Sequence, residues 1–183
     1  MTRLETGRLI LRPLEMGDLQ DFVEMMAHPE VYSMMGFGTE PDGTKRARTL
    51  DEWRPRIEYR IAQFAWEGFG EWAIIEKVSG AFAGMVGLQF YLLDRGTLAT
   101  PEIELFYGLK RDWWDKGIMK EATKAVKRHA FETLKLRRLT SVCFRENTRS
   151  ANVMRRVGMS VGPHPGNPEG ELFGCLDNPA YAG

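Results

Sequence analysis

The order of hydrophobic and polar positions along this chain predicts alternating strands and helices. Residues 101–109 alternate with a period of two, so that one face is apolar while the other carries Glu102 and Glu104. Residues 118–134 instead place apolar side chains at helical spacing, which predicts a long amphipathic helix. We therefore expect a strand that leads into a long helix through the turn around Gly117.

Other segments show the same two patterns. We expect further strands at 8–12, 70–77, 81–92 and 138–144, with an antiparallel pair turning at 78–80. We expect further helices at 16–27, 50–66 and 148–157, with Pro55 bending the second into two short helices. Because strands and helices interleave without strict βαβ repetition, the expected fold class is α/β (α+β), with a mixed, largely antiparallel central sheet flanked by helices.

Two segments lack a clear period. Residues 31–43 are rich in Met, Gly and small polar residues, and we expect a loop there. The tail at 162–183 is rich in Pro and Gly, and we expect much of it to lack regular structure apart from one edge strand at 172–176. The chain of 183 residues is long enough for one well-filled domain and short for two, so we expect a single domain over 1–183.

Composition narrows the function classes. The 25 basic and 25 acidic residues balance, which argues against a nucleic-acid protein that must neutralise many phosphates. No apolar run approaches the roughly 20 residues of a membrane helix, and the first residues lack the apolar stretch of a signal peptide. Cys143 and Cys175 form neither a metal-ligand spacing nor a disulfide framework. We expect a cytoplasmic protein without a metal, acting on neither nucleic acid nor membrane.

The turn before the long helix is the first candidate site. Gly117 precedes a helix N-terminus, where unpaired N–H groups and the helix dipole favour an anion such as a pyrophosphate. The residues alone leave a second interpretation open, in which Gly117 only permits a tight turn.

Glu102 and Glu104 form the second candidate site. They lie two positions apart on one face of the expected strand, which places their carboxyl groups roughly 7 Å apart. At that distance each carboxylate raises the pKa of the other, as suits a general base. The alternative is a pair of solvated carboxylates on the open face of an antiparallel sheet.

The helix at 148–157 contributes two more candidates. Asn147 is placed to cap this helix, and Ser150 lies on its apolar face, where a serine bonded only to backbone is the alternative interpretation. His129 falls on the apolar stripe of the long helix and is interpreted as a core histidine.

Several motifs, taken in order, resemble the landmarks of a known family. They are Glu104-Leu105-Phe106-Tyr107-Gly108-Leu109, Trp114-Asp115-Lys116-Gly117-Ile118-Met119, Asn147-Thr148-Arg149-Ser150 and Val157-Gly158-Met159, with further matches at 8–12 and 70–74. In this order and spacing the chain resembles the GNAT superfamily of acyl-CoA-dependent N-acyltransferases, and within it the RimJ/RimL-like branch. The resemblance covers residues 6–161.

The resemblance implies a fold and an activity. It implies a sheet splayed at its central strands, which holds the pantetheine of acetyl-CoA between 104–109 and 138–144. It also implies direct acetyl transfer to a primary amine in a ternary complex, with Glu104 as the base and Ser150 serving the leaving thiolate. Ser150 is the candidate because Met154 stands where many members have a tyrosine. The implied coenzyme-binding residues are Phe106, Tyr107, Leu109, Lys116, Gly117, Ile118, Met119, Asn147 and Ser150.

Four positions depart from the family's pattern: Trp114, Asp115, Met119 and Met154. Asp115 and Met119 would repel and crowd a pyrophosphate, and Met154 cannot donate a proton. They motivate an alternative hypothesis, a non-catalytic module that binds acyl-CoA or a protein partner. Under the main hypothesis the partners are acetyl-CoA and an amine acceptor chosen by 32–44, 50–66 and the tail, in a monomer or homodimer. The acceptor classes that the branch covers are protein N-termini, peptides, amino acids and small amines.

Overall fold

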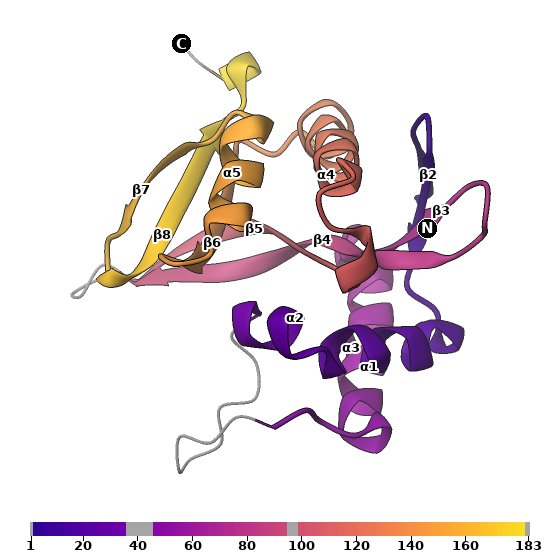
Figure 1. The fold of residues 1–183 in the computed structure, drawn as a ribbon. Helices are drawn as coiled ribbons and strands as arrows, with labels where there is room; N and C mark the ends of the chain where they lie inside the picture. Colours follow the sequence, from indigo (N-terminus) through magenta and orange to yellow (C-terminus); the bar gives the residue numbers. More distant parts are fainter. Residues whose placement is uncertain (1, 36–45, 95–98, 182–183) are drawn as a thin grey trace.

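An eight-stranded sheet forms the centre of the protein in the computed structural model, which describes residues 2–35, 46–94 and 99–181 (Figure 1). Its order is β1-β2-β3-β4-β5-β6-β8-β7. Neighbouring strands are antiparallel except β5 and β6, which are parallel. The strands are β1 (Leu4–Glu5), β2 (Leu9–Pro13), β3 (Glu71–Glu76), β4 (Phe82–Asp94), β5 (Ala99–Leu109), β6 (Arg138–Phe144), β7 (Ser160–His164) and β8 (Asn167–Asp177). This arrangement confirms the expected mixed, largely antiparallel fold.

Helices cover the sheet in two groups. In Figure 1, α4 and α5 lie above the central strands, and α1, α2 and α3 lie below them. The helices are α1 (Leu19–Ala27), α2 (Pro29–Met34), α3 (Leu50–Glu67), α4 (Ile118–Arg128) and α5 (Thr148–Val157), and a π-helical turn, His129–Thr133, extends α4. Short 3-10 turns lie at Met16–Asp18, Arg111–Trp113 and Pro179–Tyr181. Among the described residues, no helix combines the length and the apolar character that a membrane crossing requires.

Two clusters of buried side chains form the core. In the first, the apolar stripe of α4, with Ile118, Ala122 and Val126, packs on Leu105 of β5 and Leu139 of β6. The second cluster joins α1, α2 and α3 to β3 and β4, and includes Phe22, Trp53, Ile57, Ala73 and Met85. The helical spacing that predicted 118–134 is therefore the spacing that buries α4 on the sheet.

The prediction of a loop at 31–43 is wrong for its first residues. Pro29 starts α2, because the first position of a helix needs no N–H donor, and Val31 and Tyr32 are buried. A helix of six residues is too short to show a helical period in the sequence, although α2 buries two of its side chains. The rest of that prediction, from residue 36 onward, lies outside the described residues.

The expected division into two short helices at Pro55 is wrong, because α3 is one continuous helix from Leu50 to Glu67. Thr49 and Glu52 form a capping box that secures its start, with Thr49 Oγ1 accepting from the Glu52 N–H and the Glu52 carboxylate accepting from the Thr49 N–H. Pro55 lies in the second turn, where it removes one hydrogen bond near an already capped end.

The tail prediction is also wrong for most of its length. Residues 160–177 form the hairpin β7–β8, and β8 pairs with both β6 and β7, so that 172–176 is not an edge. The turn is organised by His164, whose Nδ1 accepts from the N–H groups of Gly166 and Asn167, both at 3.1 Å. Pro163 fits because β7 is the edge strand.

The pairing of β4 with β5 generates a stability prediction. A Cβ added to Gly84 would lie 2.2 Å from the Gly108 carbonyl oxygen and 2.7 Å from the Leu109 Cα, both of them backbone atoms of β5. We expect Gly84→Ala to lower the free energy of unfolding by roughly 1 to 3 kcal/mol, the usual cost of overpacking. Urea denaturation measures this.

Gly162→Ala is the matched control, because Gly162 is also a strand glycine and a Cβ there meets no atom within 4 Å. It should change stability by no more than a few tenths of a kcal/mol. Equal effects of the two substitutions would contradict the close approach of β4 and β5.

Candidate active site

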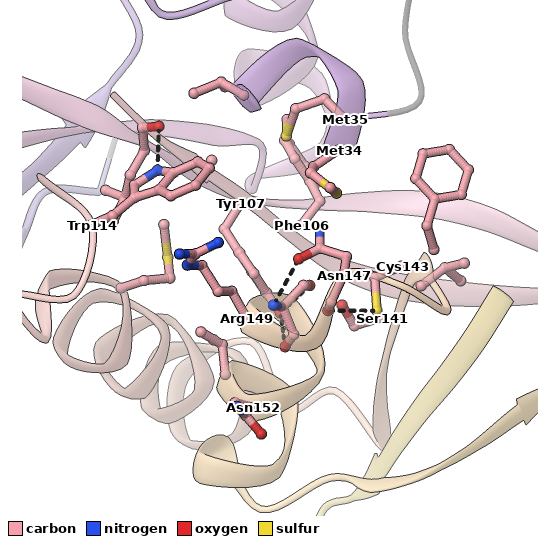
Figure 2. Close-up of a pocket in the computed structure, with 18 of the residues that line it drawn as sticks. Met34, Met35, Phe106, Tyr107, Trp114, Ser141, Cys143, Asn147, Arg149 and Asn152 are labelled. Carbon is pink, nitrogen blue, oxygen red and sulfur yellow. Dashed lines mark hydrogen bonds between the residues drawn. The ribbon is translucent and has the colours of Figure 1, made fainter. Parts of the chain in front are cut away.

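A cavity of about 970 Å³ opens where β5 and β6 separate (Figure 2). These two parallel strands pair only at Glu104 and Thr140, whereas β4 and β5 stay paired from Gly84 and Leu109 to Asp94 and Ala99. The cavity is lined by β5, β6, the N-terminal ends of α4 and α5, and the C-terminal end of α2. The cavity therefore lies at the gap between β5 and β6, beside the continuous pair of β4 and β5.

The N-terminus of α4 forms one end of the cavity. Gly117 caps this helix with a left-handed φ of 73°, and within the described residues no side chain bonds to the first N–H groups. Arg8 anchors the turn, because its Nη1 donates to the Lys116 carbonyl at 3.0 Å and its Nε to Glu121 at 2.8 Å. Gly117 and Met119 line the cavity. The turn therefore presents uncapped N–H donors at the positive end of a helix dipole.

Eight of the nine predicted coenzyme-binding residues line this cavity. Lys116 is the exception: its ammonium lies 5.2 Å from the centre of the Trp113 ring, and its contribution to the turn is its backbone carbonyl. The eight are Phe106, Tyr107, Leu109, Gly117, Ile118, Met119, Asn147 and Ser150.

Glu104 is buried on β5, with 8% of its surface exposed, and it lines the cavity. Its Oε2 accepts a hydrogen bond from Gln89 Nε2 at 2.6 Å, and its carboxylate accepts another from the Val142 N–H of β6. Burial raises the pKa of Glu104 above its usual value, and these hydrogen bonds oppose that rise. Glu104 therefore has the environment of a buried base.

The expected coupling of Glu102 with Glu104 is absent. Glu102 does not line the cavity, and its Oε1 lies 3.6 Å from Arg138 Nη1 of β6. The neighbouring carboxylate that helps to raise the pKa of Glu104 is Glu171 of β8, and burial is the larger cause. A period of two places both carboxylates on one face, but it does not show which strand lies beside them.

A pair of hydroxyl groups lies at the start of α5. Asn147 caps the helix, with its Oδ1 accepting from the Ser150 N–H at 3.0 Å. Tyr107 of β5 reaches this turn, where its hydroxyl lies 3.0 Å from Ser150 Oγ and donates to the Ser150 carbonyl at 3.1 Å (Figure 2). Burial raises the pKa of Tyr107, so its hydroxyl stays protonated at neutral pH. The sequence indicated Tyr107 as a coenzyme contact but gave no sign of this hydroxyl pair.

Two departures from the family's pattern have structural explanations. Met154 is completely buried in the core of α5 and the sheet, so it does not face the cavity. Asp115 has a left-handed φ of 59°, and its Oδ2 lies 3.9 Å from Arg149 Nε, which offsets part of its charge. Trp114 is held by its Nε1 bond to the Leu109 carbonyl at 3.0 Å, with Arg111 and Arg149 against its ring.

His129 belongs to the core, as expected. It is buried, its ring packs edge-on against Trp72 at 5.9 Å, and burial lowers its pKa.

A family model described as an acetyltransferase (GNAT) domain matches residues 8–160. The chain belongs to the GNAT acetyltransferase family. It is an acyl-CoA-dependent acetyltransferase of the mixed α/β GNAT fold.

Relatives and solved structures agree with this assignment. The chain is 27% identical over 158 residues to an uncharacterized N-acetyltransferase, p20, of Bacillus licheniformis, covering 86% of this chain and 82% of that protein. It is 27% identical to an acetyltransferase structure from Agrobacterium tumefaciens, with a TM-score of 0.78 over 96% of this chain and 94% of that one. A RimL ribosomal-protein α-N-acetyltransferase in complex with coenzyme A shares the fold at 14% identity, with a TM-score of 0.72 over 96% and 98% of the two chains.

The α4 turn generates a binding prediction. We expect Gly117→Asp to weaken acetyl-CoA binding more than Gly117→Asn does, because only aspartate sets a negative charge where the helix N-terminus should attract phosphates. Asn and Asp tolerate the left-handed φ of 73° about equally, so their difference isolates the charge.

Calorimetric titration with acetyl-CoA measures both affinities. Asp115→Gly should bind as tightly as the parent or more tightly, since it removes a carboxylate beside the same turn. Equal affinities of Gly117→Asp, Gly117→Asn and the parent would remove this turn from the coenzyme site.

Proposed function

We propose that this GNAT enzyme transfers the acetyl group of acetyl-CoA to a primary amine by direct attack in a ternary complex. The observation that carries the proposal is the convergence on one cavity of a buried carboxylate, Glu104, and a pair of hydroxyl groups, Tyr107 and Ser150. Such a cavity offers an acceptor for the amine's proton and donors for a departing thiolate.

The coenzyme's place follows from the shape and polarity of the cavity. The uncapped N–H groups at Gly117–Met119 fit a pyrophosphate, and the gap between β5 and β6 fits the extended pantetheine arm. Asn147 and Ser150 supply polar groups along that gap. The same assignment follows from the family resemblance, which supplies the residues but not their contacts.

Glu104 is proposed as the base. A free α-amino group has a pKa of about 7.7 to 8.0 and enters mostly protonated near neutral pH, so its proton must leave before or during attack. The Glu104 carboxylate lines the cavity and is buried enough for its pKa to be raised toward that task.

Tyr107 and Ser150 are proposed to serve the leaving thiolate together. Their hydroxyl oxygens are 3.0 Å apart, so Ser150 can donate to the developing charge while the Tyr107 hydroxyl turns from the Ser150 carbonyl to donate to Ser150 Oγ. Cys143 also lines the cavity, but burial raises the pKa of its thiol, which disfavours its use as a nucleophile. Direct transfer without an acyl-enzyme is therefore the favoured route.

The acceptor is proposed to enter from the side of α2 and α3. Met34, Met35 and Arg56 line that part of the cavity. The RimJ/RimL-like branch, which includes enzymes for protein N-termini, is supported by the RimL structure among those that share this fold. We propose that the acceptor is the primary amine of a protein N-terminus, an amino acid or a small amine.

A two-stage assay tests this function. Acetyl-CoA should raise the melting temperature of the protein, as a ligand of the folded state must. Thiol release from acetyl-CoA is then followed with a panel of peptides, amino acids and small amines. Release with any acceptor supports acetyl transfer, whereas stabilisation by acetyl-CoA with no release from any acceptor would favour the non-catalytic alternative.

We expect Glu104→Gln to lower turnover by roughly 10²- to 10⁴-fold, the usual contribution of a general base. Binding of acetyl-CoA should be unchanged, because the substitution removes a charge without changing size. Glu102→Gln is the control, since Glu102 faces Arg138 and should affect turnover much less. A parental rate in Glu104→Gln would show that the amine loses its proton elsewhere.

The hydroxyl pair generates a second kinetic prediction. Ser150→Ala and Tyr107→Phe should each lower turnover by roughly 10- to 10³-fold with little change in acetyl-CoA affinity, as expected for losing one donor to a developing anion. The double variant should lose less than the product of the two single losses, because the hydroxyl groups act as one bonded unit. Fully multiplicative losses would show that they act separately.

A further inference from the structure

A chain of buried and half-buried polar side chains lies behind Glu104. Gln89 of β4 sits directly opposite Glu104 in the β4–β5 register and donates to it at 2.6 Å. The Gln89 Oε1 in turn accepts from Arg60 Nη2 of α3 at 2.5 Å. Three elements that are far apart in sequence thus form one line of contacts ending at the proposed base.

The order of donors and acceptors in this line is unambiguous. A guanidinium has only donors, so the amide oxygen of Gln89 must face Arg60 and its NH₂ group must face Glu104. The Glu104 Oε2 is therefore held as an acceptor, which favours the ionised carboxylate. The usual uncertainty between the O and N of a glutamine does not arise, because Arg60 determines it.

Arg60 is held by several contacts. It is 8% exposed, its Nη1 donates to Gln63 Oε1 at 2.9 Å, and its guanidinium lies 5.2 Å from the centre of the Phe106 ring. Its Nε lies 3.7 Å from Oε2 of Glu71, a buried carboxylate of β3. Turning the guanidinium away would leave the Gln89 amide oxygen without this charged donor.

We propose that Gln89, backed by Arg60, is a positioning residue for acetyl transfer: it aims the Glu104 carboxylate into the cavity and keeps it ionised. This role rests on the proposed function of Glu104 as the base. Gln89 lines the same cavity beside Glu104, yet it neither gains nor loses a proton in the reaction.

The balance of charges around Glu104 shows why it needs such support. Burial and Glu171 of β8 raise the pKa of Glu104, and Tyr107 on the same strand is neutral. The forces that lower this pKa are the hydrogen bonds from Gln89 and from the Val142 N–H and the charge of Arg60. Without the Gln89 bond the carboxyl group would hold its proton to a higher pH, so a smaller fraction of it would be ionised below that pH.

The test measures the pKa of Glu104 directly, by ¹³C NMR titration of the side-chain carboxyl carbons in the ligand-free protein. The Glu104 signal is assigned by its disappearance in Glu104→Gln. In Gln89→Leu, which keeps the bulk but removes the hydrogen bond, the pKa should rise by roughly 1 to 2, the worth of a hydrogen bond to a charged group.

A second variant adds a like charge at the same position. Gln89→Glu keeps the shape and, when ionised beside Arg60, has no proton to donate to Glu104, so the pKa of Glu104 should rise further than in Gln89→Leu. If Gln89 only filled space, Gln89→Leu would titrate like the parent. Gln63→Leu is the matched control, because Gln63 bonds to Arg60 and Glu67 rather than to Glu104, and it should leave the Glu104 pKa nearly unchanged.

The rate of thiol release should depend on pH in the way that the NMR titration predicts. In the Gln89 variants the acidic limb of the pH–rate profile for thiol release should move to higher pH by the amount seen by NMR, and the rate should recover as pH rises. An unmoved Glu104 pKa in Gln89→Leu would overturn the inference. A parental rate in Glu104→Gln, with the Glu104 pKa still moved by the Gln89 variants, would instead overturn the proposed role of Glu104.

Discussion

The cavity exists because β5 and β6, the central strands of the sheet, pair at Glu104 and Thr140 and then diverge. A parallel pair normally continues its hydrogen bonds along both strands, so divergence leaves backbone groups that need other partners. Here the Val142 N–H donates to the Glu104 carboxylate, and Thr140 Oγ1 donates to the Ile103 carbonyl at 3.2 Å. The separation of the strands thus creates the space and also places the carboxylate in it.

The elements on each side keep the two strands apart. The long pairing of β4 with β5 holds one side, and the pairing of β8 with β6 and β7 holds the other. Helices α4 and α5 contact each other above the sheet, tied at their far ends by Lys127 Nζ, which donates to the Val157 carbonyl at 2.9 Å (Figure 1). Their N-terminal ends, at Gly117 and Asn147, both line the cavity, so two helix dipoles favour negative charge there.

Much of this fold could be predicted from local patterns, and the failures have physical causes. The helix from residue 118 was predictable because its apolar stripe is the surface that packs on the sheet. The β7–β8 hairpin could not be predicted because prolines usually indicate a loop. An edge strand and the start of a strand both tolerate proline. A short stretch of sequence does not show which strand will form the edge of the sheet.

The candidate site could likewise be predicted only in part. Glu104, Gly117 and Asn147 belong to short motifs and could be named from the sequence. Contacts between distant parts of the chain could not be predicted in this way. Glu102 contacts Arg138, and Tyr107 bonds to Ser150, and the residues of each pair lie more than 30 positions apart in the sequence. The line from Arg60 through Gln89 has no sequence signal, because polar residues on a helix and a strand normally indicate solvent exposure.

The central claim is that acetyl-CoA lies in the gap between β5 and β6 with its phosphates at the α4 turn. Backbone hydrogen exchange, measured by mass spectrometry with and without saturating acetyl-CoA, tests this claim most directly. We predict slower exchange at residues 117–120 and in β5 and β6 around Glu104 and Val142, with β1 and β2 unchanged. Stabilisation of the protein by acetyl-CoA with protection confined to other segments would contradict it.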